Sequence, residues 1–284
     1  MAKTAILLIN CPDRRGIVAA IANFLYENNA NILHADQHQD NVLGLFFMRV
    51  EFDLDGFRLE EAEFRKVFEP IAARYQMAWQ LAYSDRPATV AIFVSQYLHC
   101  LADLLHRHQS GELHCKIAFI VSNHEEARGL AGFHQVPFYY LPVNPESRQR
   151  VESQQLDLLD EHGVDLVVLA RYMQILSPRF VNRYPRRIIN VHHSFLPAFT
   201  GARPYHAAYE RGVKLIGSTS HYVTEVLDDG PIIEQDVSPI SHSDQLSDLV
   251  QKGRDLERLV LSRAVRWHLE HRILSFANKT VIFD

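Results

Sequence analysis

The chain has little that would commit it to a membrane or a disulfide framework. Its 284 residues include only three cysteines, Cys11, Cys100 and Cys115, which are widely spaced and form no CxxC pair. Such a set argues against disulfides or a structural zinc site and favours a reducing, cytoplasmic environment. The longest apolar runs fall far short of the roughly 20 residues that span a bilayer. The start of the chain is also a poor signal peptide.

An excess of positive charge is also missing. The chain has 29 lysines and arginines against 34 acidic residues, which gives a formal net charge of −5 without any basic cluster. Nucleic-acid binding needs a basic surface, so we expect a small-molecule partner and no nucleic acid. What remains is an ordinary globular composition, 47% hydrophobic and 22% charged, in a chain long enough for two domains.

The first domain is expected over residues 1–85. A strand-like run, TAILLIN, is followed by apolar residues at helical spacing from Arg15 to Asn28. Two further strand-like runs separated by DNVLG predict a hairpin, and a second amphipathic helix and a closing strand follow. The predicted order is βαββαβ, a ferredoxin-like arrangement in which two helices cover one face of an antiparallel sheet.

The segment CPDRRGIVAAIANFLYENNANILHADQ, from Cys11 to Gln37, resembles the ACT domain, a small regulatory module. The resemblance implies a homo-oligomer, a dimer or a tetramer, that binds a small effector such as an amino acid where two modules pair. The positions that match such a seam are Asp13, Arg15, Gly16, Asn31 and Ile32. A module that serves only for oligomerisation remains the alternative.

The second domain is expected over residues 86–284, after the polar linker SDRPATV. Apolar strands alternate here with amphipathic helices, which predicts a mostly parallel, Rossmann-like α/β sheet with helices on both faces. Ligands bind such sheets at the carboxyl ends of the strands. Residues 243–271 read as one long helix that could break at Gly253, followed by a last strand, KTVIF.

The stretch NVHHSFLPAFTGARPYHAAYERG, Asn190 to Gly212, begins where an apolar strand ends. Asn190 and His192 are two residues apart and therefore point to the same side of that strand. An amide beside an imidazole can stabilise an oxyanion, and a carboxylate from Asp228 in the turn LDDGP could orient the imidazole or favour its charged form. Such a trio could polarise a carbonyl and transfer a proton.

Structural interpretations of the same residues are equally simple. The pair His192 and His193 can be a hydrogen-bonded loop feature, and Asp228 lies in a sequence that commonly forms a turn. No HxxxH or HExxH spacing places a second ligand beside His192 and His193, so the pattern argues against zinc.

The longer stretch NVHHSFLPAFTGARPYHAAYERGVKLIGSTSHYVTEVLDDGPIIEQ resembles the folate-dependent formyltransferases over about residues 89–284. The shared pattern is Asn-x-His at a strand end, a Ser-Leu-Leu-Pro-like turn at 194–197, and an aspartate seven residues after a strand histidine, His221. The resemblance implies a folate pocket lined by Met173, Ile175, Leu176 and Val181 and flanked by Thr224 and Glu225. Gln174 stands where the family usually has arginine, which weakens any role for its side chain but spares a backbone contact.

Within that family the sequence is most similar to the formyltetrahydrofolate deformylases, the hydrolytic branch. No glycine occurs from Phe93 to Leu105, where a transferase of purine synthesis has a phosphate-binding loop. The extra domain and basic surface of the transfer-RNA enzyme are also missing. An ACT-like module in front, and His193 where many transferases have proline, fit hydrolysis. The resemblance therefore implies that water cleaves 10-formyltetrahydrofolate to tetrahydrofolate and formate for one-carbon and purine metabolism.

The mechanism that this resemblance implies needs no metal or redox cofactor. His192, charged through Asp228, and the Asn190 amide would stabilise the oxyanion, each such donor contributing about 3 kcal/mol. Asp228 would orient and deprotonate the water, and His193 would orient water or act as a hydrogen-bonded neighbour. Two alternatives remain open: formyl transfer to an unidentified amine, and a catalytically silent amino-acid or folate sensor.

Overall fold

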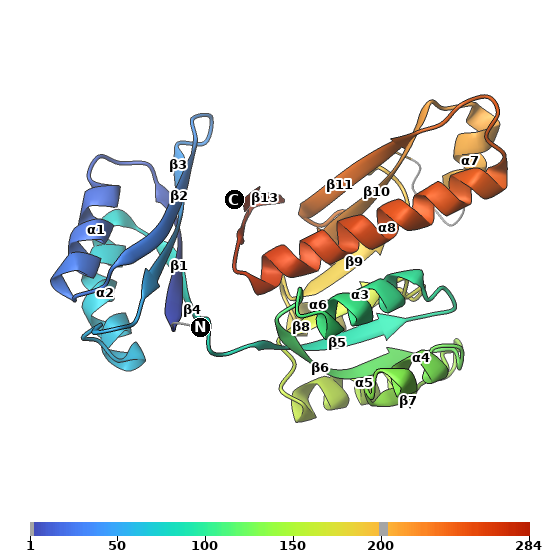
Figure 1. The fold of residues 1–284 in the computed structure, drawn as a ribbon, viewed down its shortest axis with the longest axis horizontal. Helices are drawn as coiled ribbons and strands as arrows, with labels where there is room; N and C mark the ends of the chain where they lie inside the picture. Colours follow the sequence, from blue (N-terminus) through green and yellow to red (C-terminus); the bar gives the residue numbers. More distant parts are fainter. Residues whose placement is uncertain (1–2, 199–203) are drawn as a thin grey trace. The chain divides into compact units, whose positions relative to one another are not determined.

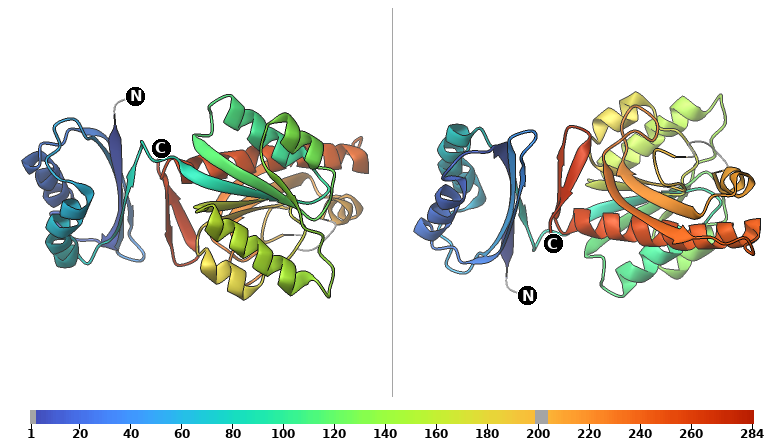
Figure 2. Two further views of the ribbon diagram at one scale, coloured as in Figure 1. Left: turned by 90° about the horizontal axis from the view of Figure 1, so that it is seen from below. Right: turned by 90° about the horizontal axis from the view of Figure 1, so that it is seen from above.

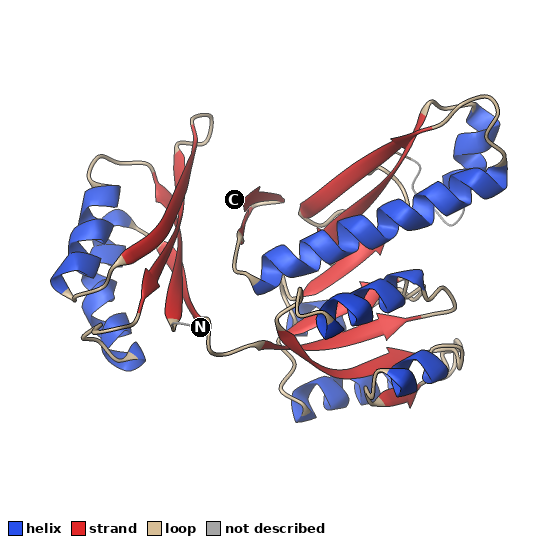
Figure 3. Cartoon of the chain, in the orientation of Figure 1, coloured by secondary structure: helices blue, strands red, loops and turns tan. Residues whose placement is uncertain are grey.

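The computed structural model describes residues 3–198 and 204–284 and divides the chain into two compact units (Figures 1 and 3). The first unit contains residues 1–87 together with 270–276 and 280–284, and the second contains 88–269 with 277–279. The C-terminal segment, which the sequence grouped with the second domain, thus belongs to the first unit.

The first unit has the predicted βαββαβ order. Its elements are β1 (Thr4–Pro12), α1 (Ile17–Glu27), β2 (Ile32–Asp40), β3 (Leu45–Asp53), α2 (Glu61–Tyr75) and β4 (Ala78–Tyr83). The strands form one antiparallel sheet in the order β2-β3-β1-β4, and both helices lie on one face of it (Figure 1). The ferredoxin-like prediction is confirmed, and β2 is an edge strand.

Strand β1 is apolar on both faces because both are covered. Leu7 and Ile9 belong to the core under α1 and α2, whereas Ile6 and Leu8 point the other way. The second face is covered by a C-terminal hairpin, β12 (Ile273–Phe276) and β13 (Lys279–Ile282). Of these two strands the sequence predicted only the last. The buried residues of this second cluster are Ile6, Leu8, Phe47, Leu274 and Phe283.

The second unit is the predicted α/β sheet. Its elements are β5 (Ala88–Val94), α3 (His99–Gln109), β6 (Cys115–Ser122), α4 (Arg128–Phe133), β7 (Phe138–Tyr140), α5 (Arg148–Glu161), β8 (Leu166–Ala170), α6 (Pro178–Arg183), β9 (Ile188–His192), α7 (Pro204–Arg211), β10 (Leu215–Tyr222), β11 (Ile232–Pro239) and α8 (Leu246–Leu269). The strand order is β11-β10-β9-β8-β5-β6-β7, parallel from β9 to β7 and antiparallel at β10 and β11. Helices α5 and α6 cover one face, and α3 and α8 lie on the other (Figure 2).

Helix α8 is continuous from Leu246 to Leu269, so the break considered at Gly253 does not occur. The glycine has a packing role instead. A Cβ atom at residue 253 would lie 2.2 Å from ring atoms of Tyr205 in α7, so only glycine permits this close approach. The same helix face is buried from Leu249 to Val265.

No helix in the described parts of the chain is long and apolar enough to cross a membrane. The three cysteines are free thiols, and burial raises the pKa of Cys11 and of Cys115 to about 11.

Candidate active site

The central residues of the site come from two neighbouring strands and the loop that follows them. Asn190 and His192 lie on β9, the last of the parallel strands, and both side chains line the same cavity. Strand β10 runs antiparallel to β9 and pairs His221 with Asn190. Asp228 follows in the loop between β10 and β11, where its backbone has a left-handed φ of 55°. The strand-end placement predicted from the sequence is therefore observed.

The Asp228 carboxylate lies between two imidazoles. Its Oδ2 is 3.3 Å from Nδ1 of His192, and its Oδ1 is 3.7 Å from Nε2 of His221. The bond to His192 is the main reason, and the one to His221 the next, that the pKa of Asp228 is held well below its usual range. The carboxylate is therefore ionised and stabilises positive charge on its neighbours.

Hydrogen bonds assign the protons of both histidines. Because carbonyl and carboxylate oxygens only accept, Nδ1 of His221 donates to the carbonyl of Tyr222 at 2.9 Å, and Nδ1 of His192 donates to Asp228. In the neutral ring of His221, Nε2 then accepts from the Asn190 amide nitrogen at 3.2 Å. Nε2 of His192 is buried and has no hydrogen-bond partner in residues 3–198 and 204–284. It is the ring nitrogen left for a ligand.

These groups line a cavity of about 540 Å³, a size typical of small-molecule sites. The predicted folate contacts Met173, Ile175, Leu176, Thr224 and Glu225 all line it, together with Asn190, His192, His193, His221 and Asp228. Val181 is the exception. It is buried in α6 and does not belong to the lining. Gln174, at the position of the family arginine, also lines the cavity.

Buried hydroxyls fix the turn that leaves β9. Thr219 on β10 donates to the carbonyl of Ser194 at 2.9 Å and accepts from the backbone N–H of Leu196 at 3.1 Å. Gln235 on β11 donates to the carbonyl of Leu196 at 3.0 Å. The Ser194–Pro197 turn is therefore held on the sheet, which fixes the backbone next to His193. Residues 199–203 of the stretch quoted above lie outside the described residues.

A second ionic cluster adjoins the site and escaped the sequence interpretation. Glu257 of α8 is buried, accepts from Tyr205 at 2.6 Å, and lies 2.8 Å from His99 and 3.3 Å from Nε of Arg171. Burial alone would raise the pKa of Glu257, but the bond from His99 and the charge of Arg171 outweigh burial and lower it. The sequence held a signal, because Glu257 lies in the apolar stripe of α8 and Arg171 directly follows β8.

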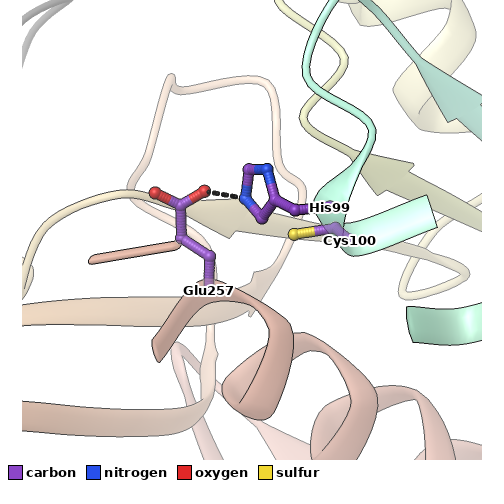
Figure 4. Close-up of side chains that lie close together, drawn as sticks. All are labelled: His99, Cys100 and Glu257. Atoms are coloured by element: carbon purple, nitrogen blue, oxygen red, sulfur yellow. Dashed lines mark hydrogen bonds and ion pairs between the residues drawn. The ribbon is translucent and has the colours of Figure 1, made fainter. Parts of the chain in front are cut away.

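His99, Cys100 and Glu257 are the one group in the described parts of the chain whose ligand atoms gather within 4.8 Å of one another (Figure 4). They do not fit a divalent cation. Burial raises the pKa of Cys100 well above its usual range, so without a metal its sulfur is a neutral thiol. Glu257 is already paired with His99, as the dashed line in Figure 4 shows, and with Arg171.

The predicted effector residues do not come together within one chain. Asp13, Arg15 and Gly16 follow the end of β1, and Gly16 has a left-handed φ of 92° before α1. Asn31 and Ile32 lie at the start of β2. The register joins that start to Phe52, which also pairs with Ala5 near the beginning of β1. The two groups are therefore separated by the length of the sheet, about 25 Å for a strand of this size.

Comparisons with known proteins agree with the two-unit architecture. The family model described as Formyl transferase matches residues 88–265, and that described as ACT domain matches residues 5–69. A formyltetrahydrofolate deformylase of Synechocystis sp. is 53% identical, with 99% of this chain and 98% of that protein covered, and one of Bacillus subtilis is 51% identical, with 98% and 93% covered. The crystal structure of a formyltetrahydrofolate deformylase from Pseudomonas syringae pv. tomato matches with a TM-score of 0.97 and 49% identity, covering 100% of this chain and 95% of that one.

Proposed function

Since the chain belongs to the formyltetrahydrofolate deformylase family and therefore hydrolyses 10-formyltetrahydrofolate to tetrahydrofolate and formate, we propose that Asn190, His192 and Asp228 perform this hydrolysis. The observation that supports the assignment most strongly is the state of His192. Its Nδ1 is held by an ionised carboxylate, while its Nε2 has no hydrogen-bond partner in the described chain and its ring lines the cavity.

The proton-transfer step follows from that arrangement. Neutral His192 accepts a proton at Nε2 from the attacking water, whose oxygen forms a bond to the formyl carbon. The imidazolium that results is stabilised by Asp228 and returns the proton to the N10 nitrogen as the C–N bond breaks, which leaves formate and tetrahydrofolate. Asp228 acts as the orienting group, because a carboxylate with so low a pKa is a poor base.

Asn190 is the residue that stabilises the oxyanion of the tetrahedral intermediate. One hydrogen of its amide nitrogen is used by His221, and the second is available to a ligand in the cavity. One such donor typically contributes about 3 kcal/mol to transition-state stabilisation. The pterin ring would lie against Met173, Ile175 and Leu176, whose side chains supply the apolar wall.

The decisive experiment is turnover of 10-formyltetrahydrofolate by the purified full chain without any amine, following formate and tetrahydrofolate together. We expect the two products in equal amounts. Turnover that requires an added amine and yields no formate would identify a transferase. Folate binding without turnover would identify a sensor. Either result would refute the proposed roles.

We also propose that no metal or redox cofactor takes part. Amide hydrolysis transfers no electrons, and His192 with Asn190 supplies both the proton transfer and the oxyanion donor that the step needs.

For the first unit we propose a homo-oligomer that binds an amino acid between copies. Antiparallel pairing of the edge strand β2 with its counterpart would bring Asn31 and Ile32 of one copy next to Asp13 and Arg15 of the other, although each chain alone keeps them apart. The open edge and exposed residues of β2 support this pairing. We place the enzyme in the cytoplasm, in keeping with its three reduced cysteines. Sedimentation with and without amino acids tests the assembly.

A further inference from the structure

A second cavity of about 240 Å³ opens beside the proposed catalytic site and has no part in the hydrolysis described above. The two cavities share three lining residues, Arg171, Met173 and His193. The ring of His193 lies 5.2 Å from that of His192 and 5.9 Å from that of Tyr205, so it stands between the reacting centre and the second cavity. A small product formed at His192 therefore has this space directly next to it.

The wall of this cavity is built around a buried cation. The side chain of Arg171 is only 8% exposed. Its Nε lies 3.3 Å from Glu257, and its Nη1 makes no hydrogen bond within residues 3–198 and 204–284. A buried N–H group of a guanidinium is costly without an acceptor, so the position of Nη1 in a cavity wall points to a ligand that supplies one.

The backbone around Arg171 is held in place for this role. Arg171 has a left-handed φ of 62°, an uncommon conformation for a residue with a side chain. Its carbonyl accepts from the backbone N–H of Ser95, and the Ser95 hydroxyl accepts from the N–H of Met173 at 3.0 Å. The ends of β5 and β8 thus clamp the residue that bears the buried charge.

The charges that line the cavity leave a positive surplus. The guanidinium groups of Arg171 and Arg254 both lie over the ring of Tyr97, 5.4 Å and 5.5 Å from its centroid. Among the described residues, Glu257 is the one carboxylate in the lining, which also contains His99, His193 and His206. Two permanent cations against one carboxylate favour a ligand with a single negative charge over a phosphate dianion.

We propose that this cavity, centred on Arg171 and Arg254, binds formate as it leaves the catalytic site, and that it is a product site for a small monocarboxylate. The assignment of formate rests on the proposed hydrolysis, whereas the anion site rests on the cavity and its charges. A carboxylate oxygen of formate would accept a hydrogen bond from Nη1 of Arg171, because guanidinium groups pair well with carboxylates.

The test measures formate binding directly. Carbon-13 formate is titrated against the full chain saturated with tetrahydrofolate, and its transverse relaxation gives the dissociation constant. For a ligand of three heavy atoms we expect a value on the order of millimolar. Arg171→Gln should weaken binding at least tenfold, because it removes the buried charge. Arg254→Gln, at the exposed rim, should weaken it about threefold.

Arg258→Gln is the matched control. This arginine lies one turn farther along α8, is exposed, pairs with Asp255 and does not line the cavity. It should bind formate as the wild type does. Equal binding by the wild type and Arg171→Gln would overturn the proposal. If Arg171→Gln does not fold, unchanged binding by Arg254→Gln would do the same.

Two further results separate this proposal from the hydrolysis. Normal hydrolysis without detectable formate binding, or binding of inorganic phosphate in place of formate, would overturn the product site and leave the catalytic roles standing. Arginine-dependent formate binding in a chain that does not hydrolyse the folate would support the anion site and refute the proposed function alone.

Discussion

Two carboxylates in the second unit have similar partners and different uses. Asp228 lies between His192 and His221, and Glu257 lies between His99 and Arg171. Both are held ionised, with lowered pKa values. Yet the side chain of Asp228 is 15% exposed in the larger cavity, whereas that of Glu257 is 1% exposed in the wall of the smaller one. Imidazole exchanges protons near neutral pH and guanidinium does not, so the first cluster suits proton transfer and the second suits fixed charge.

The largest expected effect is on catalysis at the first cluster. Replacement of His192 by alanine should lower kcat about 10³-fold, because it removes the proton carrier, and should change KM for the folate only a few-fold. The matched change at the second cluster, His99→Ala, should lower kcat less than tenfold. Steady-state kinetics on both variants check the contrast, and an equal loss in both would remove the distinction between the clusters.

Neutral substitutions of the two carboxylates should affect different quantities, the turnover rate for Asp228 and the stability of the fold for Glu257. Asp228→Asn should lower kcat by 10² or more, since the amide no longer stabilises the imidazolium, and should lower the free energy of unfolding less than Glu257→Gln does. Glu257→Gln should instead destabilise the fold by about 3 kcal/mol, because the buried Arg171 loses its partner. Turnover and urea unfolding are measured on both variants. A stable Glu257→Gln chain with full activity would contradict the structural role of that pair.

Acid should lower the stability of the wild type and of Asp228→Asn by different amounts. The folded state lowers the pKa of Asp228, so its stabilising contribution is complete above the ordinary carboxylate value of about 4 and is lost as the pH falls through the lower folded value. The wild type should therefore lose more stability than Asp228→Asn between pH 4 and pH 2. Thermal unfolding of both proteins across that pH range tests this expectation. If the stability of the two proteins falls equally with pH, the histidines do not lower the pKa of Asp228.

Chelation should have the smallest effect of all. Glu257 is already paired with His99 and Arg171, so the one group of described residues that could gather metal ligands has no vacant carboxylate. Turnover after dialysis against a strong chelator should match that of the untreated enzyme. A loss of activity that zinc or another divalent ion restores would place a metal in the reaction and refute the assignment of the second cluster.

The two clusters also differ in how far the sequence could reveal them. Asn190, His192 and Asp228 lie within 39 residues, on β9 and in the loop after β10, so strand ends and a family pattern were enough to group them. Arg171 and Glu257 are 86 residues apart and meet only because α8 packs across the sheet. The signal for Glu257 was a charge within an apolar helical stripe, but a stripe does not indicate which cation pairs with it.

Contacts between residues far apart in the sequence also explain the other points at which the structure differs from the sequence-based prediction. Gly253 looked like a helix break because glycine disfavours helices, and only the position of Tyr205 shows why it is needed. The sequence predicted a cover for only one face of the first sheet, because the hairpin that covers the other face lies more than 260 residues away from β1. Local pattern predicted the elements, and long-range packing decided their partners.

The first unit is built from the two ends of the chain, and this has a consequence for biosynthesis. Residues 88–269 are translated between β4 and the hairpin that covers Ile6, Leu8 and Phe47. At typical elongation rates of ~5–20 residues per second, the ribosome needs roughly ten to forty seconds to synthesise residues 88–269. During that time Ile6, Leu8 and Phe47 remain uncovered, because the hairpin has not yet been made. The nascent chain therefore presents a bare apolar sheet for most of its synthesis, which is the kind of surface that chaperones bind. A stop codon before residue 270 would leave that sheet uncovered for the lifetime of the protein.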